Sequence, residues 1–292
     1  LSPNAVTFTC IVKACANTEA IDKGTEIHSE IVQSDSLKCD IILATALVEM
    51  YVKFNMLAKA EQVLDELPVG DAMIWNVLIA GYIEQGQSQE ALDCFQRMQE
   101  EGLSPNIVSY IYILKACGSI VSIKKGEQIH DEIVNRGLPE KENALGTALV
   151  DMYAKCGMLE KAKKLHDELL VQSVVSWNAL ITGYALQGQG SNALNCLEQM
   201  QSEGFSPDEV TFICILKVCG DTGAIEKGKH IHDEVVRRGL LKNNNLVLGT
   251  ALVDMYAKCG FLAKAQQVHC ELEVRNAVIW NALMFGYIQQ CQ

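Results

Sequence analysis

The sequence has no run of about 18 apolar residues, so it offers no segment that would cross a bilayer as a helix. It also lacks a glycine-rich phosphate loop, which excludes P-loop nucleotide binding. No two of its 12 cysteines are three residues apart, which excludes zinc sites built on that spacing. Only 5 prolines interrupt the 292 residues, and no alternating apolar pattern predicts a strand. These absences favour a helical chain without a catalytic motif.

One motif, G-T-A-L-V-D-M-Y-A-K-C-G, occurs unchanged at 146–157 and at 249–260. A looser copy, A-T-A-L-V-E-M-Y-V-K-F-N, occupies 44–55, so the copies begin 102 and then 103 residues apart. A fixed long period predicts a tandem array, in which each unit stacks on its neighbours to bury an apolar face that it cannot bury alone.

Each long block divides into three related units of 36, 31 and 35 residues, and each unit has the pattern of two short amphipathic helices. The predicted units are 5–40, 41–71, 72–106, 107–142, 143–173, 174–208, 209–245, 246–276 and a partial unit at 277–292. Because the sequence begins and ends within the array, we expect it to be a piece of a longer protein. The open half-unit at its C-terminus favours self-association.

Periodicity and turn residues predict where the helices lie. In 147–156, Leu149, Met152, Tyr153 and Cys156 follow the i, i+3, i+4, i+7 spacing of one helical face. Gly157 comes next, at a place where a residue that tolerates positive φ ends a helix. A last helix is predicted from 277 to about 290. The chain is therefore expected to be all-α.

The unit at 174–208 begins V-V-S-W-N-A-L-I-T-G-Y and ends G-F-S-P-D, which resembles a pentatricopeptide repeat. The cycle of 36, 31 and 35 residues resembles the long, short and standard repeats of plant PLS-class proteins, over essentially the whole chain. The resemblance implies a right-handed α-solenoid superhelix of helix-turn-helix repeats that binds single-stranded RNA, one base per repeat. PLS-class proteins mostly select sites for C-to-U editing in chloroplast and mitochondrial transcripts.

In this family the fifth and the last residue of a repeat read the edge of one base, and the second residue packs against base faces. The base-reading pairs carried over are Thr9 with Asp40, Thr45 with Asp71, Asn76 with Asn106, Thr147 with Ser173, Asn178 with Asp208 and Thr250 with Asn276, followed by Asn281 without its partner. The base-packing residues are Val6, Ile42, Met73, Val108, Val175, Val210, Val247 and Val278. Two long repeats have Ile111 and Ile213 at the fifth position and match no base.

An asparagine amide both donates and accepts hydrogen bonds and suits pyrimidines, whereas a threonine hydroxyl suits purines. In chain order the pairs imply an RNA site of the form G-G-Y-n-R-U-n-A-Y, read from 5′ to 3′. A randomised RNA selection without enrichment for uracil at the sixth place and adenine at the eighth would contradict this hypothesis.

These positions also have structural explanations. Asp40, Asp71, Asn106 and Asp208 each precede a predicted helix, where N-capping contributes about 1 kcal/mol. The valines and isoleucines at the second position suit a core as well as a ligand. A polar residue that recurs at the fifth position of an apolar run favours base reading, because a purely structural helix would accept alanine there.

Charge is the main argument against RNA. The net charge is −12, whereas proteins that hold nucleic acid by its phosphates usually have a basic footprint. The acidic residues cluster in predicted second helices, away from the expected ligand face, and recognition can rest more on bases than on phosphates. Lys53, Lys155 and Lys258 end the first helix of the short repeats, where they suit either phosphates or the helix dipole.

Two apparent chemical sites belong to the repeat pattern. His-x-Glu, the first half of the zinc deaminase signature, occurs at His28, His130, His166, His232 and His269, but the P-C-x-x-C half is absent. Cysteines also recur by repeat, as at Cys15, Cys117 and Cys219, which is typical of small buried residues. We expect no metal, no cofactor, no disulfide and no enzyme activity.

The resemblance implies an RNA-recognition module of an organellar C-to-U editing factor, in the chloroplast or the mitochondrion. It also implies two kinds of protein partner, namely multiple organellar RNA-editing factor proteins and a deaminase domain in the same chain or another. One alternative is a protein-binding helical scaffold, although tetratricopeptide scaffolds keep a period of about 34 residues. The other is an RNA stability or translation factor that acts by occupying its site.

Overall fold

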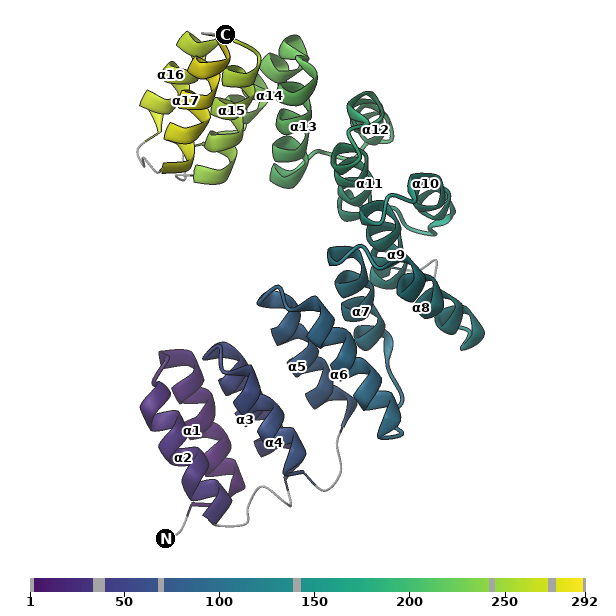
Figure 1. The fold of residues 1–292 in the computed structure, drawn as a ribbon, viewed down its shortest axis with the longest axis vertical. Coiled ribbons are helices and arrows are strands. Elements are labelled where there is room, and N and C mark those ends of the chain that lie inside the picture. The colour runs from purple at the N-terminus through teal and green to yellow at the C-terminus, as the bar shows by residue number, and fades with distance from the viewer. Residues whose placement is uncertain are drawn as a thin grey trace. The chain divides into compact units, whose positions relative to one another are not determined.

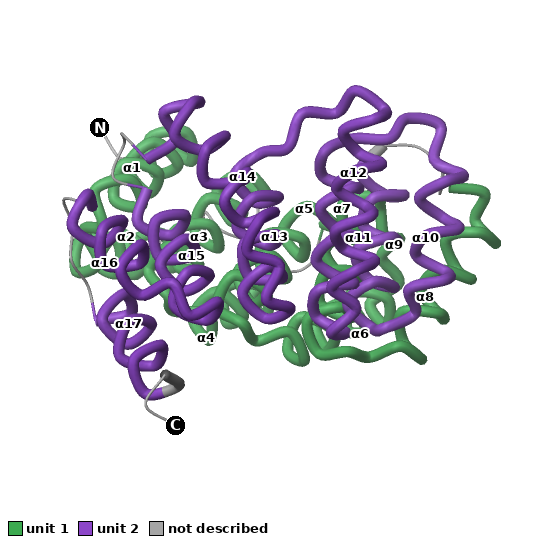
Figure 2. The backbone as a smooth tube through the Cα atoms, turned by 90° about the horizontal axis from the view of Figure 1, so that it is seen from above, with its two compact units in different colours: residues 1–140 green, residues 141–292 purple. Residues whose placement is uncertain are grey.

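The computed structural model describes residues 3–33, 40–67, 71–138, 143–241, 245–272 and 277–290, and every regular element in these ranges is an α-helix. The chain forms two compact units, 1–140 and 141–292 (Figure 2). The first unit contains α1 (Ala5–Thr18), α2 (Ile21–Gln33), α3 (Ile41–Lys53), α4 (Leu57–Asp65), α5 (Ala72–Glu84), α6 (Ser88–Glu100), α7 (Ile107–Ser119) and α8 (Ile123–Asn135). The second contains α9 (Asn143–Lys155), α10 (Leu159–Glu168), α11 (Val174–Leu186), α12 (Gly190–Ser202), α13 (Glu209–Thr222), α14 (Ile225–Arg237), α15 (Leu246–Lys258), α16 (Leu262–Glu271) and α17 (Ala277–Gln290).

Within each unit the helices alternate between two layers (Figure 1). Each odd-numbered helix contacts the next odd-numbered one, as α1 contacts α3 and α13 contacts α15, and each even-numbered helix packs on the odd-numbered helix before it. Many even-numbered helices also contact the odd-numbered helix that follows, as α4 contacts α5. Each unit is therefore a stack of helix pairs that share one core, which confirms the all-α repeat architecture.

The helix pairs fall into three groups by the length of their units. The long repeats are α1–α2, α7–α8 and α13–α14, the short repeats are α3–α4, α9–α10 and α15–α16, and the standard repeats are α5–α6, α11–α12 and the lone α17. The names follow the lengths of the predicted units; assignment to the PLS class stays a prediction.

The predicted face of α9 is largely confirmed. Leu149, Met152 and Tyr153 are fully buried, whereas Cys156 near the helix end is only half-buried. Gly157 follows the helix with φ of +78°, in the left-handed region that glycine enters at little cost. The periodicity in the sequence therefore locates both the buried face and the end of this helix.

The core is densest where odd-numbered helices meet. Trp75 of α5 and Trp177 of α11 are at most 1% exposed, and replacing such a side chain by alanine costs roughly 3–5 kcal/mol. Glycines allow the helices to approach closely: a Cβ atom on Gly183 would lie 2.6 Å from the Cβ atom of Ala154 in α9. The close approach of α9 and α11 therefore sets the distance in space between the solvent-facing residues of one repeat and those of the next.

The cysteines follow the expected pattern only in part. Cys15, Cys117, Cys219, Cys94 and Cys196 are buried, but Cys156 and Cys259 are half-buried, since they follow or end a helix near the repeat edge. Burial raises the pKa of the Cys94 thiol to about 12 and that of Cys196 to about 11, which leaves both thiols protonated and unreactive at neutral pH.

The last described helix has an apolar face that is not covered. Trp280, Met284, Phe285 and Ile288 of α17 are between 48% and 59% exposed. Self-association through this face stays a prediction. None of the described helices combines the length and the apolar character that a membrane span requires.

Candidate nucleic-acid interface

All eight second-position residues are exposed, although most other apolar residues of their helices are buried. Their exposed fractions run from 46% at Val108 to 69% at Val6. On the same helices, Phe8 is 3% exposed and Ile113 is fully buried. A core role, which the sequence left open, is therefore excluded. Each of these eight odd-numbered helices therefore carries one apolar side chain that faces away from the core and is available to a ligand.

The fifth position lies three residues after the second and therefore on the same side of its helix. In the second unit, both positions line one groove of about 690 Å³ formed by α13, α15 and α17. Val247 and Thr250 line it from α15, Val278 and Asn281 line it from α17, and Ile213 lines it from α13. In α15 and α17 the predicted base-packing and base-reading residues thus share one open groove.

In the two complete standard repeats the structure brings the fifth and last residues together. Asn76 Nδ2 donates to Asn106 Oδ1 at 3.2 Å, and Asn178 Nδ2 donates to Asp208 Oδ1 at 2.9 Å. The two donors are 7% and 8% exposed, whereas Asn106 and Asp208 are exposed. Each bond links the first helix of one repeat to the turn before the next repeat, so the outer residue is held in a defined orientation.

The last residues of the repeats are also N-caps. Asp40, Asp71, Asn106, Ser173 and Asp208 precede α3, α5, α7, α11 and α13, and each side chain accepts a hydrogen bond from a backbone N–H of that helix. These residues therefore do cap helices, as the structural explanation predicts, but capping occupies only one polar atom of each side chain. Asn106 keeps Nδ2 and Asp208 keeps Oδ2 for a ligand, whereas the single hydroxyl of Ser173 is already bonded.

The Asp208 carboxylate is charged and tightly bonded. Partial burial by itself would raise its pKa, but hydrogen bonds from Thr211 and Asn178 outweigh burial and hold the pKa below its ordinary value. The Thr211 hydroxyl lies 2.6 Å from Asn178 Oδ1 and 2.9 Å from Asp208 Oδ1. Thr211 is fully buried and completes the pair, a role that sequence reasoning missed.

The threonine positions are built differently. Thr9, Thr45 and Thr250 donate to the carbonyl groups of Ala5, Ile41 and Leu246, four residues back in their own helices. Among the described residues, no hydrogen bond joins Thr9 to Asp40 or Thr45 to Asp71. Thr147 is half-buried and Asn281 is exposed. Asn276, the predicted partner of Thr250, lies outside the described residues.

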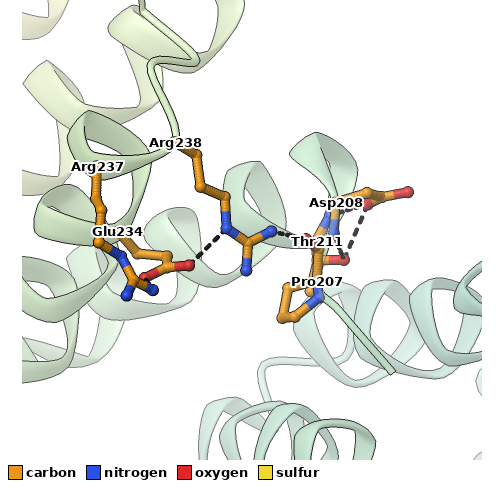
Figure 3. A network of polar contacts seen from close by, with 6 residues as sticks. All are labelled: Pro207, Asp208, Thr211, Glu234, Arg237 and Arg238. Carbon is orange, nitrogen blue, oxygen red and sulfur yellow. Dashed lines mark hydrogen bonds and ion pairs between the residues drawn. The ribbon is translucent and has the colours of Figure 1, made fainter. Parts of the chain in front are cut away.

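Arg238 supports the turn that carries Asp208 (Figure 3). Its guanidinium donates to the Pro207 carbonyl at 2.7 Å, bonds Glu234 on α14, and lies over the Phe212 ring at 5.2 Å. The contact joins residues 31 positions apart, and nothing in the sequence pattern indicates it. Arg238 fixes the backbone from which Asp208 projects.

The lysines of the short repeats are held by neighbouring side chains. Lys155 pairs with Asp151 at 2.7 Å, and Lys258 pairs with Asp221 at 2.8 Å and with Asp254 at 3.0 Å. Lys53 donates to the Asn17 amide oxygen at 3.0 Å. Two of the three charges predicted for phosphate contact or helix capping are therefore neutralised within the protein.

Comparisons with known proteins agree with this arrangement. The description "PPR repeat family" matches residues 70–119 and 172–221, and "PPR repeat" matches 147–174 and 250–276. A chloroplastic pentatricopeptide repeat-containing protein of Arabidopsis thaliana is 35% identical over 99% of this chain and 35% of its own length. A mitochondrial one from the same plant is 31% identical over 94% of this chain and 49% of its own length. The chain thus spans about a third to a half of the length of these relatives.

A solved structure shares the fold. It is that of the pentatricopeptide repeat protein PPR10 in complex with an 18-nt psaJ RNA element, with a TM-score of 0.67 and 17% identity. The match covers 98% of this chain and 48% of PPR10.

Proposed function

The chain belongs to the pentatricopeptide repeat family, and from this we propose that it binds single-stranded RNA in a sequence-specific manner, one base per repeat. The observation that carries the proposal is the pairing of Asn178 with Asp208, and of Asn76 with Asn106, each beside an exposed apolar residue at the second position of the same helix. The RNA bound by PPR10, which has the same fold, supports this class of ligand.

The two asparagine pairs offer different groups to a base. With Oδ1 taken by the helix cap, Asn106 offers its amide N–H, a donor that matches the N3 acceptor of cytosine. Asp208 offers a carboxylate oxygen, an acceptor that matches the N3–H of uracil. We therefore assign cytosine to the third place of the RNA site and uracil to the sixth.

The remaining reader positions complete the proposed site. Thr9 and Thr45 with their partners suit guanine, Thr147 a purine, Thr250 with Asn276 adenine, and Asn281 a pyrimidine. The exposed second-position residues pack between the bases, a contact that tolerates any sequence. Ile111 and Ile213 offer no hydrogen-bonding group, so their repeats leave a base unread.

We further propose that the chain is a PLS-class array that acts in a chloroplast or mitochondrion as the recognition module of a C-to-U editing factor. The repeat lengths and the chloroplastic and mitochondrial relatives support this assignment. Editing then requires a deaminase domain in the same chain or another, and multiple organellar RNA-editing factor proteins that contact the long repeats. A stability or translation factor would use the same RNA interface without the deaminase.

The test is binding to the labelled RNA GGCAAUAAC, beside a scrambled RNA and the variant Asn178→Thr, Asn281→Thr. Wild-type chain prefers the site, and the variant shifts its preference toward purines at the sixth and ninth places. Each place contributes about 1–3 kcal/mol of discrimination, or roughly fivefold to 150-fold in affinity. Equal affinity for both RNAs would contradict base reading and favour a protein-binding scaffold.

A further inference from the structure

The first helices of the repeats carry six lysines and no arginine in the described residues. Three are the short-repeat lysines Lys53, Lys155 and Lys258, which are held by other side chains. The other three lie one in each long repeat, at the ninth position: Lys13, Lys115 and Lys217. All three of these are exposed, and within the described residues none of their ammonium groups has a hydrogen bond or an ion pair.

Helical spacing places these long-repeat lysines on the ligand face. In α13, Val210, Ile213 and Lys217 follow the i, i+3, i+7 spacing of one side of a helix. Ile213 and Lys217 both line the groove that also contains Thr250 and Asn281. The Cα atom of Lys217 therefore lies about one helical turn, roughly 6 Å along the axis, from that of the fifth residue, Ile213.

The short repeats explain why two of the three long-repeat lysines, Lys13 and Lys217, are unpaired. Asp221 lies four residues after Lys217, at the spacing of a helical ion pair, but Lys258 of the next repeat bonds it at 2.8 Å. At the corresponding place after Lys13, Asn17 accepts from Lys53 at 3.0 Å. In both repeats the residue that would hold the long-repeat lysine is occupied by a short-repeat lysine.

We propose that Lys13, Lys115 and Lys217 bind the phosphate backbone of the RNA, so that the long repeats hold the strand while the other repeats read it. This inference rests on the proposed RNA binding. In the repeats of Ile111 and Ile213, the lysine four residues further on is the charged group that the ligand face retains. Because the chain has a net charge of −12, binding of a polyanion depends on local positive charge, which these three lysines supply on the first helices.

The experiment compares two pairs of substitutions that remove the same charge. Lys115→Gln with Lys217→Gln removes unpaired lysines, and Lys155→Gln with Lys258→Gln removes lysines already neutralised by carboxylates. The affinity of each chain for GGCAAUAAC and its scrambled control is measured from about 50 to about 200 mM salt, where each phosphate contact on a single strand adds about 0.7 to the slope of log K against log salt.

We expect the first pair of substitutions to lower the slope of log K against log salt by about 1.4. The ratio of the wild-type affinity to the affinity of this variant therefore falls about sevenfold between about 50 and about 200 mM salt. The ratio between site and scrambled RNA stays at the wild-type value, because no base contact is lost. The control pair changes the slope by less, and Lys115→Arg with Lys217→Arg retains it. Circular dichroism checks that every variant keeps the wild-type helix content.

An unchanged slope in the first pair, with site preference intact in wild-type chain, would overturn phosphate binding while base reading stands. The same result is expected if the lysines serve an acidic protein instead. An equal loss of slope in both pairs of substitutions would also overturn phosphate binding by these lysines. The overall electrostatic field of the protein would then explain the salt dependence. Wild-type chain that does not distinguish the two RNAs would overturn the proposed function itself.

Discussion

In the two complete standard repeats the fifth side chain bonds away from its own helix, whereas in two of the short repeats, at Thr45 and Thr250, it bonds back to it. Asn178 donates across to Asp208 at 2.9 Å, but Thr250 donates to the Leu246 carbonyl of its own helix at 2.6 Å. The asparagine is 8% exposed and the threonine is half-buried. The fifth position is therefore bonded to the last residue of the repeat in these standard repeats. In these short repeats it carries a hydroxyl that is bonded only to its own helix.

This difference affects how much conformational entropy the fifth side chain loses when a base binds. A side chain already fixed by its partner loses little conformational freedom when a ligand binds, so more of each hydrogen bond appears as affinity. A threonine hydroxyl that donates to a carbonyl of its own helix must either break that hydrogen bond or share its proton between the carbonyl and the base. We expect the standard repeats to set most of the base preference and the short repeats to refine it.

The largest effect is expected where a short repeat meets the following standard repeat. His166 of α10 is fully buried against Trp177, with ring centroids 4.3 Å apart. Burial and, to a smaller extent, the charge of Lys163 lower the pKa of His166 to about 4, against smaller opposing contributions from Asp167 and Glu203. The unfolded chain therefore takes up a proton at a higher pH than the folded chain does.

Above pH 6.5 neutral His166 makes its full contribution to the free energy of unfolding. That contribution is lost as the pH falls toward about 4, by about 2–3 kcal/mol. The first unit provides the control, because Leu64 takes the equivalent place there and is also buried. His166→Leu should abolish this part of the pH dependence in urea unfolding at pH 7 and pH 4.5. Equal losses in wild type and variant would show that other groups cause it.

The next effect concerns the buried hydroxyl that completes the standard pair. Thr211→Val keeps the shape of the side chain but removes the donor to Asn178 Oδ1 and the acceptor of the Asp208 backbone N–H. A buried oxygen left without a partner costs about 1–3 kcal/mol. Urea denaturation should show this loss together with weaker discrimination of uracil at the sixth place. Wild-type stability in the variant would mean that water replaces the hydroxyl.

A reciprocal exchange tests whether the outward atom selects the pyrimidine. Asp208→Asn gives the second standard repeat the amide of the first, and Asn106→Asp gives the first the carboxylate of the second. We expect the sixth place to change from uracil to cytosine and the third to change the other way, each by about tenfold, or 1.4 kcal/mol. Binding to four RNAs that vary only at these places measures it. A change at one place but not at the other would contradict a shared code.

The helix ends could be predicted from the sequence because each is a local pattern, whereas the asparagine pairs are implied by the family resemblance. Gly157 and the N-cap Asp208 are examples. The exposure of Val175 could not, since an apolar residue at helical spacing suits a core or a ligand equally until neighbouring helices are placed. The contact of Arg238 with the Pro207 carbonyl depends on how two helices pack, and no local pattern encodes that packing.

The smallest expected effect completes the comparison, with the same chemical change made in a short repeat. Thr250→Val removes a hydroxyl whose acceptor, the Leu246 carbonyl, still accepts the backbone bond of its helix, so no buried group loses its only partner. The free energy of unfolding should change by less than about 0.5 kcal/mol. Purine preference at the eighth place should fall, because valine has no group to offer a base. If Thr250→Val destabilised the chain as much as Thr211→Val does, the hydroxyl would be structural in both classes. The distinction between a bonded pair and an isolated reader would then be wrong.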